Sequence, residues 1–462
     1  MIVMSGAASG MRRGAIMLGG VGAGFLAWAL LDGIVDEPGR RVAGIFAFAA
    51  IFWATRVIPL FATSLAVVIA SILLTAEQGG LAREGGIEAD QYLAQFGSDI
   101  LMLFLGGLAL SVALSKHHLD NAIATRVLQP FVRRPLLLIY AVMGITAFFS
   151  MWMSNTATTA MMLAIIGSLL RDLPKKDRYG TGLVLAVAMG ANIGGLSTPI
   201  GTPPNAIALS ALRGAGYDVT FLRWMLMAVP LALMLLAIAG LVIHWLYRPE
   251  KTQDFGDVKT QRLTKESWMS LVVLLLAITS WLTSGVHGIP DGVIALGAAA
   301  LLVILGLIDG DDLKKIEWPV LILMWGGLTL GLAMELTGLV DHVGELPLGR
   351  LPDFLLTGVV LVLALGLSLF ISNTATAALL VPIVLAMAVP EEGLLVVITA
   401  LACSFAMAMP VSTPPNALTY GTGRIAVSDL LRVGGLMAAV AIIIMMAGYR
   451  VMLPLTLPVG NP

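Results

Sequence analysis

Runs of about twenty apolar residues recur along the whole chain, and no other feature constrains its fold as strongly. A helix of this length spans the hydrocarbon core of a bilayer. Charged residues make up only 12% of the chain, about half the share typical of soluble proteins, so lipid is the solvent that suits it. We therefore expect an all-α integral membrane protein with eleven transmembrane helices. They lie near residues 14–31, 42–58, 60–76, 98–116, 181–213, 222–247, 268–286, 290–308, 318–338, 393–420 and 429–452.

Charge, cysteine and histidine content exclude several other classes. The net charge of −1 gives no basic field for nucleic acid. The single cysteine, Cys403, cannot form a disulfide within the chain. The histidines show no metal-ligand spacing, and no nucleophile–base pair of an intramembrane enzyme is visible. The first apolar run follows Arg12 and Arg13 and lacks a cleavage region, which indicates a first transmembrane helix rather than a signal peptide.

Two longer apolar segments, 135–170 and 353–389, do not fit single straight helices. Each carries the polar triplet Ser-Asn-Thr near its middle. Irregular backbone at membrane depth is tolerated only where protein or a wet cavity shields it from lipid. We therefore expect two re-entrant hairpins, each entering and leaving the membrane by the same face.

The distribution of Lys and Arg predicts the orientation. With the N-terminus inside, the C-terminus outside and both hairpins re-entrant, most of the 27 basic residues fall on the inner side of the cytoplasmic (inner) cell membrane. A single crossing in place of either hairpin would weaken this bias. The acidic, Gly-rich loop 76–98 then lies outside, and the polar linker 248–267 lies in the cytoplasm.

Three motifs occur twice in the same order and indicate an internal repeat. FLGGL at 104–108 matches MWGGL at 324–328, SNTAT at 154–158 matches 372–376, and TPPNA at 202–206 matches 413–417. Each unit has an odd number of crossings, so tandem units lie in opposite orientations, as in many transporters. The predicted parts are a tail and first transmembrane helix (1–41), a first inverted repeat (42–247), the linker (248–267) and a second inverted repeat (268–462).

The SNTAT segments suit the binding of a small anion. Ser, Asn and Thr are good helix N-caps, and the free N–H groups and positive dipole end of a capped helix attract anions. The first half of each hairpin ends at the same point and leaves carbonyls that, with hydroxyl and amide oxygens, are suitable ligands for Na⁺. The alternative is a cap on a kinked helix with no ligand.

The TPPN segments place paired prolines inside apolar spans. Each proline removes a backbone donor and frees a carbonyl upstream, which costs several kcal/mol in hydrocarbon unless a partner satisfies it. A bound ion is one such partner, and a kink that serves only helix packing is the alternative. The pairs Gly106–Gly107 and Gly326–Gly327 are expected to let helices approach closely.

No Lys or Arg lies at mid-depth in any predicted span, so a bound anion would lack a fixed counter-charge. Bound cations could supply it, which makes cation coupling natural, whereas a neutral substrate is the competing inference. A channel lined by the two hairpins is a further alternative.

The paired SNT motifs, each followed by a TPPN-bearing broken helix, resemble the divalent anion/sodium symporter family over nearly the whole chain. This resemblance implies a homodimer in which a transport domain moves against a scaffold as an elevator. It also implies C4-dicarboxylates such as succinate, malate and fumarate as substrates, or else citrate or sulfate. Most members of the family are coupled to Na⁺, and some are exchangers.

The resemblance also implies the site residues. Substrate would contact the hairpin tips and the TPPN segments at Ser154, Asn155, Thr156, Ser372, Asn373, Thr374, Thr202, Thr413 and Pro414. One Na⁺ site would use Ser150, Ser154, Asn155 and the carbonyl near Gly201, and the other would use Ser368, the carbonyl of Ile371, Asn373 and Ser412. We expect a secondary transporter that imports a small di-anion with Na⁺, with membrane lipid as its surroundings and no nucleic-acid partner. The alternatives are a Na⁺-independent dicarboxylate exchanger and a symporter for sulfate, citrate or another small anion.

Overall fold

The computed structural model describes residues 6–77, 87–171, 173–248, 262–344, 351–387, 389 and 392–452, and all regular structure in these ranges is helical. Eight of the helices there are long and apolar enough to cross a membrane. The predicted all-α membrane fold is confirmed, and the count of eleven crossings stays a prediction. Most of the linker expected at 248–267, and residues 1–5 of the expected tail, lie outside the described residues.

The helices follow one another without intervening strands in the described part of the chain. The first half contains α1 (Gly6–Leu30), α2 (Glu37–Thr55), α3 (Leu60–Thr75), α4 (Ala89–Ala94), α5 (Asp99–Lys116), α6 (Leu119–Leu128), α7 (Pro135–Ser150), α8 (Asn155–Leu169), α9 (Arg178–Gly194), α10 (Pro203–Gly214) and α11 (Phe221–Leu246). The second half contains α12 (Lys265–Leu282), α13 (Ser284–His287), α14 (Asp291–Ile304), α15 (Gly310–Leu313), α16 (Trp318–Leu336), α17 (Leu339–Gly344), α18 (Asp353–Phe370), α19 (Asn373–Leu385), α20 (Glu392–Ser404), α21 (Pro414–Gly421) and α22 (Val427–Met452). Short 3₁₀ turns lie at η2 (Gln95–Gly97), η3 (Gln129–Phe131) and η4 (Gly195–Ser197).

Four breaks in helical structure coincide with the repeated motifs. The SNT segments separate α7 from α8 and α18 from α19, and the segments that precede the TPPN motifs separate α9 from α10 and α20 from α21. The spans expected at 181–213 and 393–420 are therefore each two helices. The paired prolines occupy the first turns of α10 and α21, where a missing N–H costs nothing because that group has no intrahelical partner.

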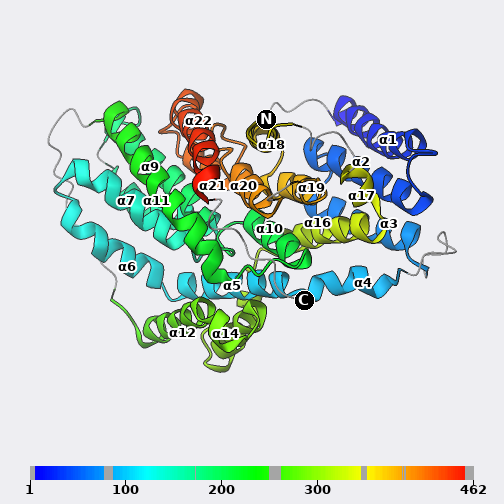
Figure 1. The fold of residues 1–462 in the computed structure, drawn as a ribbon. Coiled ribbons are helices and arrows are strands. Elements are labelled where there is room, and N and C mark those ends of the chain that lie inside the picture. The colour runs from blue at the N-terminus through cyan, green and yellow to red at the C-terminus, as the bar shows by residue number, and fades with distance from the viewer. Residues whose placement is uncertain are drawn as a thin grey trace.

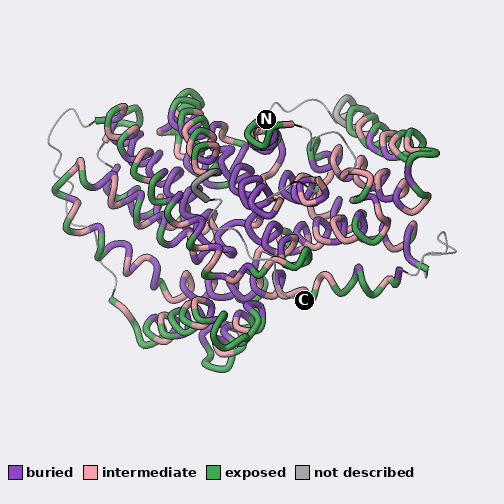
Figure 2. Tube along the Cα trace, viewed as in Figure 1, coloured by how far each residue is buried: buried purple, intermediate pink, exposed green. Residues whose placement is uncertain are grey.

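Helices α10, α19 and α20 lie near the middle of the molecule (Figure 1). Helices α9 and α20 are buried along almost their whole length, and Figure 2 shows the buried chain concentrated there. In Figure 1, α7, α9 and α11 lie side by side at one end, α1 to α3 lie at the other with α16, and α12 and α14 pack on α5 along the lower edge. The candidate site is thus enclosed by two peripheral groups of helices.

The expected close approach at the paired glycines is confirmed. A Cβ atom built on Gly106 would lie 2.6 Å from the Cβ of Ala295, and one on Gly326 would lie 2.7 Å from the Cα of Ser64. Side chains do not fit at such separations, so α5 meets α14, and α16 meets α3, through glycine.

Large apolar side chains cover the outer surface. Phe25 is 68% exposed, Trp245 81%, Ile304 79% and Phe370 76%. Exposure of this kind on several long apolar helices fits a molecule whose outer solvent is hydrocarbon.

Candidate functional site

The first SNT segment forms a tight tip between two short helices. Helix α7 ends at Ser150, and α8 begins at Asn155. Ser154 is the N-cap of α8, with an extended ψ of 133° and a hydroxyl that accepts a hydrogen bond from the backbone N–H of Ala157 (3.3 Å). The cap satisfies one of the free amides of the first turn and leaves others to face a ligand.

The second SNT segment repeats this geometry. Ser372 is the N-cap of α19, and its hydroxyl accepts from the backbone N–H of Ala375 (3.1 Å). Asn155, Thr156, Asn373 and Thr374 form the first turns of the two capped helices, and all four are half-buried. Both tips therefore present a positive helix end and a row of polar side chains, which is an arrangement suited to a carboxylate or another small anion.

The side chain of Asn155 is fixed by its surroundings. Its Oδ1 accepts a hydrogen bond from the hydroxyl of Ser150 (2.5 Å), and the same hydroxyl also lies 2.7 Å from the carbonyl oxygen of Ala191. A Cβ atom on Gly195 would lie 2.6 Å from Oδ1 of Asn155, so only glycine leaves room for this amide. The backbone of Gly201 packs against Gly195 in turn. The structure thus brings together the residues proposed for the first Na⁺ site.

The equivalent residues of the second half are not satisfied internally. The hydroxyl of Ser368 and Oδ1 of Asn373 are buried without an oxygen or nitrogen partner, unlike Ser150 and Asn155, whereas the hydroxyl of Thr376 lacks a partner just as that of Thr158 does. The nearest partner for the hydroxyl of Ser368 is the sulfur of Cys403, which is only a weak hydrogen-bond acceptor. Buried oxygens without partners are costly, and a bound cation would satisfy them. The two tips therefore share their caps but differ in how many oxygens are free.

The other two residues proposed for the second Na⁺ site, Ile371 and Ser412, differ in whether their oxygens are free to bind an ion. Ile371 ends α18 with extended backbone, which takes its carbonyl out of the helical hydrogen-bond pattern. The hydroxyl of Ser412 instead donates to the carbonyl of Met409 (2.7 Å), so it would have to exchange this bond to face an ion.

The TPPN asparagines carry a role that sequence reasoning missed. Both are fully buried. The Nδ2 of Asn205 donates to the carbonyls of Leu196 (3.1 Å) and Thr198 (2.8 Å), nine and seven residues upstream. The Nδ2 of Asn416 donates to Met407 (2.7 Å) and Met409 (3.0 Å), at the same two separations. The carbonyls freed at each break therefore accept hydrogen bonds from an asparagine amide of the chain itself. The sequence had suggested a bound ion as one possible partner for these carbonyls.

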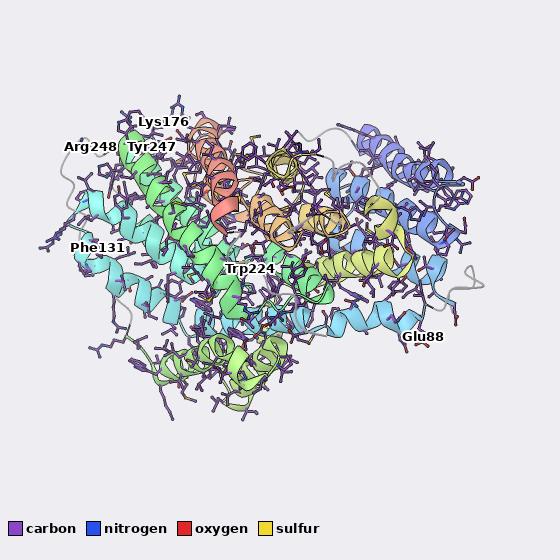
Figure 3. The ribbon with its side chains drawn as sticks, in the orientation of Figure 1. Glu88, Phe131, Lys176, Trp224, Tyr247 and Arg248 are labelled. Carbon is purple, nitrogen blue, oxygen red and sulfur yellow. The ribbon has the colours of Figure 1, made fainter. Side chains whose placement is uncertain are left out.

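Further contacts at these breaks place the remaining TPPN residues. The indole of Trp224, labelled near the centre of Figure 3, donates to the carbonyl of Leu196 (3.2 Å). Thr413 is the buried N-cap of α21 and accepts from the N–H of Asn416 (3.3 Å), whereas Thr202 is a buried N-cap without such a bond. Pro414 is exposed in the first turn of α21. A motif search could find both asparagines, because they lie at matching positions of the two repeats.

The motifs of one half pack against those of the other. Helix α10 contacts α19 and α20, and helix α21 contacts α8 and α9. The Nδ2 of Asn192 on α9 donates to Oδ1 of Asn416 on α21 (3.0 Å), and both side chains are buried. Each TPPN helix therefore lies beside the capped helix of the opposite half, so segments far apart in sequence meet at each tip.

A carboxylate lies at the first tip, and no sequence motif predicts it there. The hydroxyl of Ser154 donates to Oε1 of Glu317 (2.6 Å), the residue before α16. Both side chains line a cavity of about 330 Å³ with Ser111, Lys116 and Lys315. The contact links a tip of the first half to a helix of the second, and it was missed because it depends on tertiary packing.

The positive charge in this cavity is largely matched already. Lys116 pairs with Asp309 and Asp312, and Lys315 pairs with Asp312 (2.8 Å). The hydrogen bond from Lys116 is the main reason why the pKa of Asp309 lies below its ordinary value. Lys116 is thus not a free counter-charge for an anion at the tip.

An apolar outer surface around two capped tips and two amide-bridged helix breaks defines this molecule as a membrane transport protein. The sequence profile described as "Sodium:sulfate symporter transmembrane region" matches residues 29–454, and the chain belongs to this family. The resemblance to divalent anion/sodium symporters is thereby confirmed. The protein is a transporter and not an enzyme, and the family to which it belongs is described as one of sodium-coupled symporters.

Curated relatives match over most of their length. The chain is 31% identical over 443 residues to the sodium-dependent dicarboxylate transporter SdcS of Staphylococcus saprophyticus, covering 87% of this chain and 83% of the relative. It is 30% identical over 447 residues to an uncharacterized transporter of Haemophilus influenzae, covering 91% and 93%. The solved structure of the YdaH transporter of Alcanivorax borkumensis is similar in fold, with a TM-score of 0.57 at 15% identity over 81% of this chain and 90% of that one.

Proposed function

We propose that the protein imports a small di-anion, a C4-dicarboxylate such as succinate, malate or fumarate, together with Na⁺. The observation that carries the proposal is the matched pair of capped helix ends at Ser154 and Ser372, each beside the TPPN helix of the opposite half. Two positive helix ends suit the two carboxylates of one substrate. The name of the SdcS relative, a sodium-dependent dicarboxylate transporter, points to the same substrate class.

We assign substrate contact to the tips and Na⁺ to the oxygens behind them. Asn155, Thr156, Asn373 and Thr374 would face the carboxylates. The free oxygens of Ser368 and Asn373 favour a Na⁺ site in the second half, since hydroxyl and amide oxygens are ligands that hard cations prefer. A cation there would also supply the counter-charge that the described helices lack near the tips.

The motion is proposed to be an elevator movement of the hairpins and broken helices within a homodimer, with the N-terminus in the cytoplasm and the C-terminus outside. The short second arm of each expected hairpin supports a re-entrant arrangement. Helices α8 and α19 have 15 and 13 residues, or ~20–22 Å at 1.5 Å per residue, less than the ~30 Å of the hydrocarbon core.

The test is uptake of labelled succinate by proteoliposomes, with and without an inward Na⁺ gradient. We expect accumulation that requires Na⁺ and stops when the gradient is collapsed. Uptake that ignores Na⁺ but needs dicarboxylate inside the vesicles would establish exchange instead and overturn the symport proposal.

Sulfate is the second candidate substrate, because the matching family profile is described as a sodium:sulfate symporter. The charged oxygens of sulfate surround one sulfur atom and lie closer together than the two carboxylates of a dicarboxylate. Sulfate would therefore contact one tip more closely than the other. Labelled sulfate in the same vesicles, with succinate as competitor, distinguishes the two: Na⁺-driven sulfate uptake unaffected by succinate would replace the dicarboxylate assignment.

A further inference from the structure

A second cavity, of about 560 Å³, opens where the start of α9, the end of α11 and the start of α22 meet. Four basic side chains line it, those of Lys176, Arg178, Arg424 and Arg432; we name this cavity the basic pocket. Figure 3 shows Lys176 and Tyr247, which both line it, together at one end of the molecule and far from Glu88 at the other. It is separate from the cavity at the first SNT tip, since the two share no lining residue.

The one carboxylate in the lining does not neutralise these cations. Oδ1 of Asp429 accepts from the hydroxyl of Tyr247 (2.8 Å), and Oδ2 accepts from the backbone N–H of Ala426 (2.8 Å). Within the part of the chain that the structure describes, no ion pair joins Asp429 to the basic side chains of the pocket. The pocket therefore keeps an excess of positive charge.

Two of the four basic residues are structural and two are free. Arg178 donates to the carbonyl of Leu246 (2.8 Å), and Arg424 donates to the carbonyl of Pro174 (3.0 Å) at the end of the first hairpin. Lys176 and Arg432 are exposed and form no hydrogen bond or ion pair with any described residue. Two fixed and two available cations around one cavity suit the binding of an anion.

We propose that the basic pocket binds a phosphoryl group. A phosphoryl group offers several acceptor oxygens to donors that converge from different helices, and a guanidinium group recognises it in a bidentate manner. Ser428 and Arg432 lie four residues apart on α22 and therefore share a face, and the first turn of α22 adds the positive end of its dipole.

The headgroup of an anionic phospholipid is the favoured source of this group. Trp245, next to lining residue Leu246, is 81% exposed, and Leu241 one turn earlier is 62% exposed. Exposed tryptophan marks the level of the lipid headgroups, and the apolar faces of α11 and α22 beyond it would contact acyl chains. Ile443 of α22 is 66% exposed and continues this apolar face. Free phosphate shares the chemistry and would bind the same donors.

The basic pocket is also joined to the helices of the candidate site. The hydroxyl of Thr181 on α9 donates to the carbonyl of Arg424 (3.0 Å), three residues after α21 ends. Asn192, further along α9, donates to Asn416 on α21. An occupant held by Arg178 at the start of α9 and by Arg424 just after α21 would therefore connect the two helices that carry this polar contact.

The experiment is native mass spectrometry of the detergent-solubilised full chain, titrated with short-chain phosphatidylglycerol, with phosphatidylcholine as the neutral-headgroup control. Removal of two surface charges by Lys176→Gln with Arg432→Gln should weaken phosphatidylglycerol binding by about 25-fold, or about fivefold for each charge. The matched control is Lys265→Gln with Lys314→Gln, which removes two exposed charges elsewhere and should leave the binding unchanged.

Inorganic phosphate is added in a separate arm as a competitor, with thermal unfolding as its readout. Protection by phosphatidylglycerol that is lost in the double variant supports the lipid. Protection by inorganic phosphate alone, lost in the same variant, supports the pocket with a soluble occupant. Equal binding of both ligands to the wild type and the Lys176/Arg432 variant would overturn the proposal, whatever the protein transports.

Discussion

The amide of Asn205 should be a main determinant of the stability of the first broken helix. Asn205→Ala removes its hydrogen bonds to the carbonyls of Gly195 (3.1 Å), Leu196 and Thr198. The carbonyl of Leu196 keeps its bond from Trp224, and that of Thr198 keeps a longer one from the N–H of Gly201 (3.3 Å). A buried group that loses its hydrogen-bond partner costs about 1–3 kcal/mol, so we expect Asn205→Ala to lower the free energy of unfolding by about 2–4 kcal/mol.

The corresponding change in the second half should cost more. Asn416→Ala removes the bonds to Met407 and Met409 and also leaves the amide of Asn192 without its acceptor. By the same reasoning, Asn416→Ala should lower the free energy of unfolding by about 3–6 kcal/mol. Asn205 has a third carbonyl partner, Gly195, but only Asn416→Ala leaves a second buried amide, that of Asn192, without its acceptor, and this sets the expected order.

The assay is thermal unfolding of detergent-solubilised protein, followed by the fraction that remains monodisperse after heating. Asn121→Ala is the control, since Asn121 lies on α6 and its side chain bridges no helix break. Asn205→Asp keeps the volume but turns a donor into a carboxylate that faces carbonyl oxygens, so it should be at least as unstable as the alanine variant. If Asn205→Ala unfolded at the same temperature as the wild type and as Asn121→Ala, the amide bridge would not be what stabilises the break.

Three further changes test the site. Ser368→Ala should weaken the apparent affinity for Na⁺ about tenfold with little loss of stability, because the buried hydroxyl has only the weak Cys403 sulfur as a partner. Ser270→Ala removes another buried hydroxyl away from the site and should leave the Na⁺ dependence of uptake unchanged. Equal Na⁺ dependence of uptake in both variants would contradict the assignment. Glu317→Gln keeps an acceptor for the hydroxyl of Ser154 but removes a negative charge that would repel the substrate at the tip. The KM for succinate should therefore fall about fivefold, equivalent to ~1 kcal/mol. An unchanged or higher KM would show that the carboxylate does not face the substrate. Gly195→Ala should abolish uptake, because the added Cβ would lie 2.6 Å from Oδ1 of Asn155. The control is Gly167→Ala on α8, where an added Cβ meets no atom within 4 Å and uptake should be normal. Normal uptake by both variants would refute the fixed placement of Asn155.

The sequence predicted the parts of this molecule that depend on local chemistry. Serine is a preferred helix N-cap, and proline is favoured in the first turn of a helix because it cannot continue one. The positions of the tips and breaks followed from these rules.

Contacts between distant segments did not follow from local chemistry. The bond between Ser154 and Glu317 spans 163 residues, and that between Asn192 and Asn416 spans 224. Nothing within one turn of Glu317 distinguishes it from an ordinary residue at the start of a helix. The difference between the satisfied Asn155 and the unsatisfied Asn373 likewise arises from tertiary packing around two identical pentapeptides.

The pairing of Asn192 with Asn416 also sets an order for biogenesis. A ribosome makes α9 long before it makes α21, so the amide of Asn192 enters the membrane without the acceptor that it will finally use. The nascent first half must wait, shielded by insertion machinery or by transient partners, until the second half arrives. A chain stopped after α11 would keep this unpaired amide and the uncovered face of α9, and membrane quality control should remove it.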